Sequence, residues 1–579
     1  MIETHNRASL CVNINCVMRL NAILRSLLVI SLLVMSQHCL YAQSYHTTSK
    51  KAIKDYETAR QYLYNKDYDK ALSKIDRSLS YDGNFIDALL LKAELMMEMQ
   101  LDEDAIEVYE KLFSVDSMAY PRASMALAKL YMSHHKYDES AGMLKWFLNL
   151  KSQKENYRAY AEKLLSMTLF RKELYYNPVV YNPVNVGHSI NTVYDEYVNQ
   201  YYPADDKLIF TKRYKTDAGS HLEEKVFVAT RYDSLWSLPR LMFEGFENVG
   251  AVNVSSDGNE IYFSASDWAD GYGSCDIYCI KLINGRWSRP VNVRAVNTSG
   301  WESQPCLDAE GRQLFFVRST KGGASSDIFV SYRQDDGSWG KAERLNSNVN
   351  TSGNEMAPFL HHDGQTLYFA SDTHNGMGGY DLFMSRKDSD GEWSEITNLG
   401  YPLNTEGDEI NIVVAPDAKM AFISAKRDEG FGAYDIYSFE LDERFRPEPV
   451  DLHDNASPYV YAMNREESVS LRDIYFEFDS AELTEGSYDG VMALVDFLAL
   501  YDEINIELIG HTDDMGDVDY NISLSERRAE SVGKALVDNG ISPERIKTKG
   551  CGATQPLFPN DSDKHRALNR RVEMRYINP

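Results

Sequence analysis

The spacing of apolar and small residues divides the chain into three parts with different periods. Residues 50–173 place small residues at a helical spacing and show no strand-like alternation. Residues 174–450 alternate apolar and polar positions over short runs that are separated by Asp-Gly and similar turns. After a polar stretch at 451–470, residues 471–579 switch repeatedly between the two patterns. The chain is therefore predicted to be multidomain, with an all-α, an all-β and an α/β part in that order.

The all-α part repeats about every 34 residues, and turns at 65–67, 100–102 and 134–136 divide each repeat into two helices. Small residues recur at this period in the first helix and again in the second: Ala59, Ala93 and Ala128, then Ala71, Ala105 and Ser140. This period is typical of tetratricopeptide repeats, and it predicts three repeats with a capping helix at 157–170. Such an array binds peptides or partner helices, or it serves only as a spacer or dimerisation element. We favour partner binding.

The all-β part contains five copies of one hairpin, about 50 residues apart, at 204–210, 256–263, 308–316, 362–369 and 416–422. A second strand and then a Trp strand follow each hairpin, with Phe445 in place of Trp in the last copy. Four strands in each repeat predict a β-propeller, and the repeats resemble the TolB-type, WD-repeat-like propeller. The five recognisable copies predict five blades. The alternative is a sixth blade built from residues 174–200.

Four aspartates occupy equivalent positions in these repeats: Asp276, Asp327, Asp381 and Asp435. Repetition of one residue at one place in a repeat favours a structural role, such as accepting backbone N–H groups in a turn. The chain contains neither a G-x-S-x-G elbow nor an H-E-x-x-H helix. We therefore predict no catalytic residues, no metal site and no cofactor.

Patterning in the last part predicts an α/β sandwich with its helices on one side of a sheet. The expected strands span 471–478, 504–509, 546–549 and 571–576, and the expected helices span 491–500 and 524–539. Ser523 and Glu526 have the spacing of a capping box, and Gly540 is a stop signal. The second helix is therefore expected to begin at Ser523.

The first 42 residues read as a secretory signal peptide preceded by a short tail. Met18 is the expected start, and cleavage is expected after Ala42. Lipidation of Cys39 is the alternative, but His38 stands where a lipidation motif needs a small residue. No later run is apolar enough for a membrane span. The mature protein is thus expected to be exported, without a transmembrane segment.

Net charge and cysteine content narrow the classes of partner and compartment. A formal net charge of −27 argues against binding to nucleic acid or to anionic lipid. Of seven cysteines, four lie outside the leader: Cys275, Cys279, Cys306 and Cys551. So few cysteines do not make a disulfide scaffold, and we expect free buried thiols. A single disulfide among Cys275, Cys279 and Cys306 is the alternative.

Several blocks of the last part resemble the C-terminal OmpA-like domain in order and spacing. They are Asp473 to Ser480, Gly510 to Asp513, Asn521, Leu524 to Ala529, Gly540-Ile541 and Asn569 to Glu573. The resemblance implies non-covalent binding of the diaminopimelate-containing stem peptide of peptidoglycan, without cleavage. It also implies roles for individual residues: Asp513 for the ligand's ammonium group, Arg528 for its carboxylate, Asn521 in support, Asp479, Ser480 and Thr512 in the pocket, and Arg571 as a neighbour.

The chemistry of Asp513 and Arg528 agrees with such a ligand. A zwitterionic amino-acid end needs one anion and one cation, and arginine binds a carboxylate better than lysine because it can donate two parallel hydrogen bonds. The alternative is that Asp513 and Arg528 simply pair with each other.

These inferences combine into a non-enzymatic scaffold in the periplasm of a Gram-negative envelope, at the inner face of the outer membrane. The order of domains is similar to Bacteroidetes proteins that include an anchoring component of type IX secretion machinery, although residues 451–470 leave no room for that family's extra β-sandwich. The resemblance implies envelope or secretion-machinery proteins as partners of the first two parts. The alternative is a propeller enzyme that processes glycans or peptides and uses the last domain only as a tether.

Overall fold

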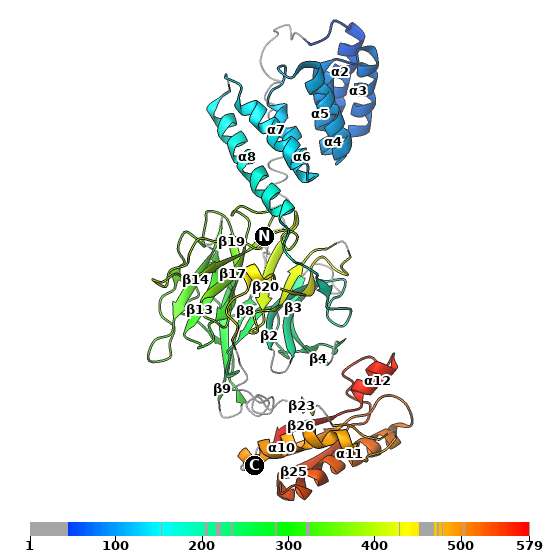
Figure 1. Cartoon of the computed structure of the whole chain (residues 1–579), viewed down its shortest axis with the longest axis vertical. Helices are drawn as coiled ribbons and strands as arrows, with labels where there is room; N and C mark the ends of the chain where they lie inside the picture. The colour runs from blue at the N-terminus through cyan, green and yellow to red at the C-terminus, as the bar shows by residue number, and fades with distance from the viewer. Residues whose placement is uncertain are drawn as a thin grey trace, which may run out of the picture.

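The computed structural model describes residues 45–577, apart from residues 152, 203–205, 216–221, 233–234, 284–285, 320–324, 428, 451–467, 472–473, 478 and 502–503. The expected leader at 1–42 and most of the expected linker at 451–470 lie outside these residues. Figure 1 shows three parts along the long axis, which we call the arm (50–176), the ring (184–450) and the C-terminal domain (468–577). The multidomain prediction, with helices first and sheets after them, is confirmed.

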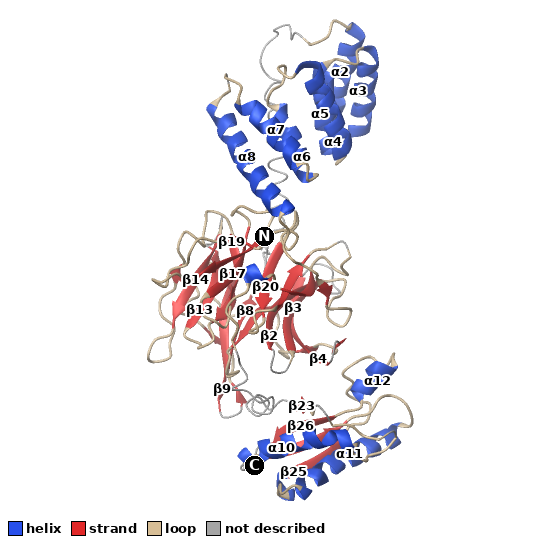
Figure 2. Ribbon diagram, in the orientation of Figure 1, coloured by secondary structure: helices blue, strands red, loops and turns tan. Residues whose placement is uncertain are grey.

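The arm consists of helices that pack against their neighbours in sequence (Figure 2). Each small residue predicted at a helix contact is buried, and Ser140 donates a hydrogen bond to the carbonyl of Ala128 at 2.8 Å. Lys66, Gln100 and His135 take left-handed φ values in the three equivalent turns. The helices are α2 (Lys50–Tyr64), α3 (Tyr68–Tyr81), α4 (Ile86–Glu98), α5 (Asp102–Asp116), α6 (Ala123–Ser133), α7 (Tyr137–Leu148) and α8 (Glu155–Tyr176).

The strands of the ring form five antiparallel units within the described residues, and a parallel pairing of Trp301 with Cys275 joins units 2 and 3 into one nine-stranded sheet. Unit 1 contains β2 (Asp195–Tyr202), β3 (Lys207–Lys215), β4 (Leu222–Tyr232), β5 (Leu235–Trp236) and β6 (Arg240–Leu241). Unit 2 contains β7 (Val249–Val254), β8 (Glu260–Ser266), β9 (Cys275–Ile283), β10 (Arg286–Trp287) and β11 (Val291–Asn292). Unit 3 contains β12 (Trp301–Leu307), β13 (Gln313–Ser319), β14 (Ser326–Tyr332) and β15 (Glu343–Arg344).

The last two units repeat the pattern and close the ring. Unit 4 contains β16 (Glu355–Leu360), β17 (Thr366–Ser371), β18 (Asp381–Arg386) and β19 (Thr397–Asn398). Unit 5 contains β20 (Glu409–Val414), β21 (Met420–Ala425), β22 (Asp435–Glu440) and β1 (Val184–Asn185), which pairs with β22 although it precedes unit 1 in sequence. The stretch considered for a sixth unit thus supplies the outer strand of unit 5. The first strands β2, β7, β12, β16 and β20 are neighbours around the centre.

A repeated carboxylate fixes the entry to four of the first strands. In unit 3, the backbone N–H and the hydroxyl of Thr298 both donate to Glu302, which is fully buried. The same arrangement joins Thr192 to Glu196, Thr351 to Glu355 and Thr405 to Glu409. A buried carboxylate is tolerated because these hydrogen bonds satisfy it.

The C-terminal domain has one four-stranded sheet with strand order β23-β26-β24-β25, in which β24 and β25 are parallel. Helices α10 and α11 both pack on the face that carries Ile506, Leu508, Val572 and Met574, as the sequence predicted. The elements are β23 (Ser468–Ser470), α10 (Tyr488–Leu500), β24 (Asn505–Gly510), α11 (Val518–Asp538), β25 (Ile546–Gly550), α12 (Asp563–Asn569) and β26 (Val572–Ile577).

Two element predictions for this domain are wrong. The described residues of the expected strand at 471–478 show only an isolated bridge between Phe476 and Leu483, and the strand is β23, inside the expected linker. Helix α11 begins at Val518 rather than Ser523, because the side chain of Asp517 accepts hydrogen bonds from the N–H groups of Asp519 and Tyr520.

The arm meets the ring through one compact junction. Nε of Arg171, on α8, donates to the carbonyl of Gly376 at 2.9 Å. Tyr175 forms an aromatic cluster with His135 and Tyr401, whose ring centroids lie 4.6 and 5.0 Å from its own and 6.3 Å from each other. The end of α8 is thus attached to the ring by both polar and aromatic contacts.

Candidate functional site

The loop after β24 presents Asp513 at one end of the sheet of the C-terminal domain. The N–H of Thr512 donates to the carbonyl of Gly552 at 3.0 Å, which fixes the start of this loop against the end of β25. Thr512 and Asp513 are both buried, and no partner is found among the described residues for the hydroxyl of Thr512. Within this loop, one oxygen of the Asp513 carboxylate accepts a hydrogen bond from the N–H of Met515 at 3.1 Å.

Asn521, on the first turn of α11, holds the rest of this loop in place by hydrogen bonds. Its side-chain amide donates to the carbonyl of Met515 at 3.0 Å and to that of Asp513 at 3.4 Å. Asn521 is 5% exposed, so these hydrogen bonds replace water. The predicted supporting role of Asn521 corresponds to a contact with the loop backbone.

Arg528 follows Asn521 by seven residues and lies on the same side of α11. Its Nε donates to the carbonyl of Ser480 at 2.9 Å, and its guanidinium lies 5.1 Å from the ring centroid of Phe476. Arg528 is 4% exposed, and its Nη1 has no hydrogen-bond partner in the described part of the chain. Burial lowers the pKa of Arg528, and the nearby Arg570 lowers it further. A desolvated cation with a free donor is a receptor for an anion.

Asp479 and Ser480 approach the same place from the segment before α10. Asp479 is exposed, takes a φ of +50°, and accepts a hydrogen bond from the hydroxyl of Tyr520 at 3.0 Å. Ser480 contributes its carbonyl to Arg528. The structure therefore brings five of the predicted residues to one rim: Asp479, Ser480, Asp513, Asn521 and Arg528.

Arg570 is the site residue that sequence reasoning missed. Its Nη1 lies 2.6 Å from Oδ2 of Asp513. Arg571, the predicted neighbour, instead pairs with Glu573 and donates to the carbonyl of Gln555. Successive residues beside a strand point in opposite directions, so only one of the two arginines can face Asp513. The sequence did contain this candidate, because either arginine of the adjacent pair Arg570-Arg571 could have been the one that faces Asp513.

Asp513 and Arg528 form no ion pair with each other among the described contacts, because each has a different polar partner. The two opposite charges thus lie on one rim with separate partners, Asp513 in an ion pair with Arg570 and Arg528 on the carbonyl of Ser480. His511, just before them, is fully buried and lies 3.8 Å from Glu573. Burial, helped by Arg571, lowers the pKa of His511 to about 4, so it is neutral at pH 7.

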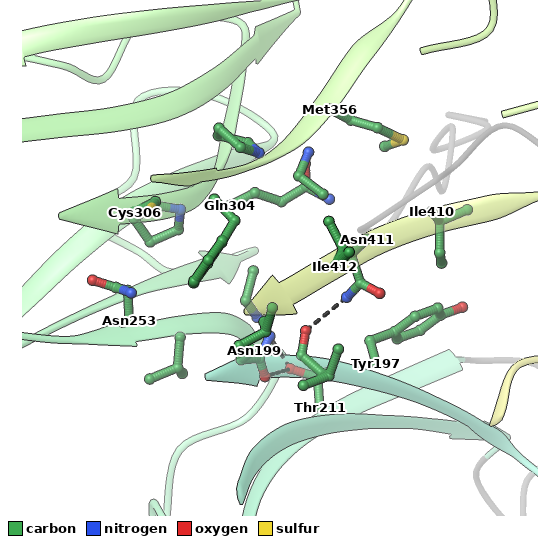
Figure 3. Close-up of a pocket in the computed structure, with 18 residues that line it drawn as sticks. Tyr197, Asn199, Thr211, Asn253, Gln304, Cys306, Met356, Ile410, Asn411 and Ile412 are labelled. Atoms are coloured by element: carbon green, nitrogen blue, oxygen red, sulfur yellow. Dashed lines mark hydrogen bonds between the residues drawn. The ribbon is translucent and has the colours of Figure 1, made fainter. Parts of the chain in front are cut away.

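The ring encloses a cavity of about 70 Å³ at its centre, lined by the first strands of all five units (Figure 3). Its amides join one unit to the next: Asn411 donates to the carbonyl of Val198, and Gln304 accepts from the N–H of Ala357. Among the lining residues, only Tyr197 and Cys306 carry a titratable group. Burial raises the pKa of Cys306 to about 12, and it also raises the pKa of Tyr197 well above its usual value. These groups offer no acid–base pair for catalysis at neutral pH.

The repeated aspartates of the ring have the predicted structural role where their loops are described. Asp276, Asp381 and Asp435 each accept hydrogen bonds from two backbone N–H groups of the loop before their own strand. Asp327 instead pairs with Arg344. In the described part of the chain, no cluster of three His, Cys, Asp or Glu residues could hold a metal ion.

The cysteines and helices of the described residues add two further findings. Cys275, Cys279 and Cys306 are buried free thiols, as predicted, which excludes the alternative disulfide. Cys551 is also free but only partly buried. No helix within the described ranges combines the length and apolar character that a bilayer crossing requires.

Comparison with known proteins places the similarity in the C-terminal domain. The model of the OmpA family matches residues 475–570. Outer membrane porin F of Pseudomonas fluorescens is 44% identical over 101 residues, which cover 17% of this chain and 31% of the relative. Peptidoglycan-associated lipoprotein of Pseudomonas putida is 36% identical over 115 residues, which cover 19% of this chain and 67% of the relative. The chain thus spans about a third and about two thirds of the length of these two curated relatives.

Among solved structures, the peptidoglycan-associated lipoprotein from Burkholderia pseudomallei shares 27% sequence identity. The match covers 18% of this chain and 88% of that chain, with a TM-score of 0.18.

Proposed function

Because the chain belongs to the OmpA family through its C-terminal domain, we propose that this domain binds peptidoglycan non-covalently at the rim formed by Asp513 and Arg528. The observation that carries the proposal is the pair of opposite, separately held charges, with Nη1 of Arg528 free to donate. The relative named peptidoglycan-associated lipoprotein supports the same ligand.

The proposed ligand group is the zwitterionic end of diaminopimelate in the stem peptide. Its ammonium group binds Asp513, whose carboxylate has lone pairs left after accepting from Arg570. Its carboxylate binds Arg528, and the hydroxyl of Thr512 is a second donor beside it. Asn521 holds the loop, Asp479 and Ser480 lie on the same rim beside Arg528, and Arg571 supports the site indirectly through Glu573.

We further propose that the arm is a tetratricopeptide array and that the ring is a five-bladed propeller. Paired helices with equivalent left-handed turns support the first assignment. Five units closed by the pairing of β1 with β22 support the second. The two parts would present surfaces to envelope or secretion-machinery proteins, as in the type IX-associated proteins that share this order of domains.

The protein as a whole is then a non-enzymatic scaffold at the periplasmic face of the outer membrane, held there through the cell wall. Relatives that are outer-membrane or lipoprotein components of the envelope support this location. The cavity of the ring, whose lining lacks an acid–base pair, favours the scaffold over the alternative of a tethered enzyme.

Co-sedimentation of the whole protein with purified peptidoglycan sacculi tests the proposal. Asp513→Ala and Arg528→Ala should each leave most of the protein in the supernatant, because a charged hydrogen bond contributes roughly 1.5–3 kcal/mol. Asp514→Ala and Arg527→Ala are matched controls, because these neighbours are exposed and should sediment like the parent. Equal sedimentation of all five proteins would refute the proposal.

A further inference from the structure

The ring contacts the C-terminal domain through a short segment of unit 1. The N–H of Leu238 donates to the carbonyl of Leu557 at 2.6 Å. The hydroxyl of Tyr232 lies 3.1 Å from Oγ of Ser470, and its ring packs edge-on against Phe558 at 5.9 Å. One aromatic side chain and one backbone group thus reach the loop at 555–558.

This contact lies beside the face of the sheet that α10 and α11 leave uncovered. Along β26, Val572 and Met574 join the core under the helices, so Glu573 and Arg575 point the other way. Arg240 of the ring and this charged face line a shared cavity of about 320 Å³. Among the described residues, the hydrogen bonds and the aromatic contact between the ring and the C-terminal domain lie at Leu557, Phe558 and Ser470.

The loop at 555–558 is held from its other side by residues next to the binding site. The side-chain oxygen of Asn569, which is fully buried, accepts from the N–H groups of Leu557 and Phe558 at 2.8 and 2.9 Å. Its side-chain nitrogen returns a hydrogen bond to the carbonyl of Phe558 at 2.9 Å. The next residue in the chain is Arg570, which holds Asp513.

We infer that the ring positions the ligand site: Tyr232 and Leu238 hold the loop at 555–558, the loop holds Asn569, and Asn569 places Arg570 against Asp513. This inference rests on the proposed function, which it deepens by making affinity for the stem peptide depend on ring docking. Tyr232, Leu238 and Asn569 are positioning residues, because they act through Arg570. Binding at the cell wall and the placement of the ring are then coupled, and by linkage each affects the other.

Two variants of the full chain distinguish the loss of ring docking from a general loss of folding. Tyr232→Ala removes both contacts of this side chain, whereas Tyr232→Phe keeps the aromatic packing. Tyr332→Ala is the matched control, because Tyr332 is a half-exposed tyrosine in unit 3. Calorimetric titration with a soluble diaminopimelate-containing stem peptide should show affinity about three- to tenfold weaker for Tyr232→Ala. Tyr232→Phe should restore most of the affinity, and Tyr332→Ala should match the parent.

Amide hydrogen exchange without ligand gives an independent readout. Tyr232→Ala should lower protection of residues 555–572 and of the loop at 511–517, while the other units of the ring keep theirs. Unchanged protection at 555–572 would overturn the inference, and so would lost protection with unchanged affinity. If the parent binds no stem peptide, the proposed function fails, and the exchange result alone decides whether the ring holds the loop.

Discussion

Nη1 of Arg570 lies 2.6 Å from Oδ2 of Asp513, and Oδ1 of the same carboxylate accepts a hydrogen bond from the N–H of Met515 at 3.1 Å. Both oxygens are therefore oriented before any ligand arrives. Preorganisation of this kind lowers the cost of binding, because the protein group need not be ordered on association.

Replacing Arg570 should weaken binding without abolishing it. Arg570→Ala leaves the Asp513 carboxylate in place but removes the contact to its Oδ2, so the carboxylate can rotate more freely. Since Arg570 is 42% exposed, the loss should be near 1 kcal/mol, or about fivefold in the dissociation constant for the stem peptide. Arg570→Lys, which keeps the charge, should fall between the parent and Arg570→Ala in titration calorimetry. Unchanged affinity for Arg570→Ala would show that Met515 alone orients the carboxylate.

Glu224 should make the stability of the ring depend on pH. It is 3% exposed, and its Oε1 has no hydrogen-bond partner among the described residues. Burial raises the pKa of Glu224 to about 7, and Arg213 offsets only part of this effect. The folded state then binds more protons than the unfolded state, where the pKa is about 4.3, so stability falls as pH rises through this window.

Glu224→Gln removes this titration and should flatten the pH dependence. The variant should gain roughly 3 kcal/mol relative to the parent between pH 4 and pH 8, as a pKa shift of this size implies. Denaturant unfolding followed by tryptophan fluorescence at both pH values measures the difference. Glu223→Gln is the control, since its carboxylate pairs with Lys225. Parallel pH profiles for the parent and Glu224→Gln would contradict the assignment.

Arg171 should keep the arm at a fixed orientation to the ring. Its Nε donates a hydrogen bond to the carbonyl of Gly376. Burial lowers the pKa of Arg171, and the nearby charge of Asp381 offsets part of this effect. Arg171→Ala should widen the distribution of arm–ring distances in spin-label measurements, with one label on α2 and one in unit 3. Lys163→Ala changes an exposed cation on the same helix and should keep the narrow distribution. A narrow distribution for Arg171→Ala would show that the aromatic contacts of Tyr175 suffice.

The sequence predicted the helices and strands correctly wherever the spacing of apolar and small residues matches the residues that are buried in the fold. Ala59 and Ala71 are buried where paired helices meet, and the repeated hairpins of the ring lie where their Asp-Gly turns indicated. Repetition also identified Asp276, Asp381 and Asp435 as loop acceptors, because a structural device recurs in each unit whereas a catalytic group does not.

The wrong or missed predictions concern residues that are exposed or whose partners lie far away in the sequence. Val518 and Ile522 are exposed on the first turns of α11, so apolar spacing could not show that the helix begins at Val518. Ile474 is buried without ladder pairing, because β23 already pairs with β26 at this edge of the sheet. Arg570 and Arg571 are the same residue type and differ only in the direction of their side chains, which the sequence does not specify.

Discrimination between two stem peptides tests the central claim most directly. One peptide carries diaminopimelate, and the other carries lysine, which has the same ammonium group but lacks the carboxylate beside it. The whole protein should bind the diaminopimelate peptide at least about tenfold more tightly, because only that peptide engages Arg528. Arg528→Ala should abolish the preference, while Arg527→Ala retains it. Equal affinity of the parent for both peptides, or an unchanged preference in Arg528→Ala, would contradict the account.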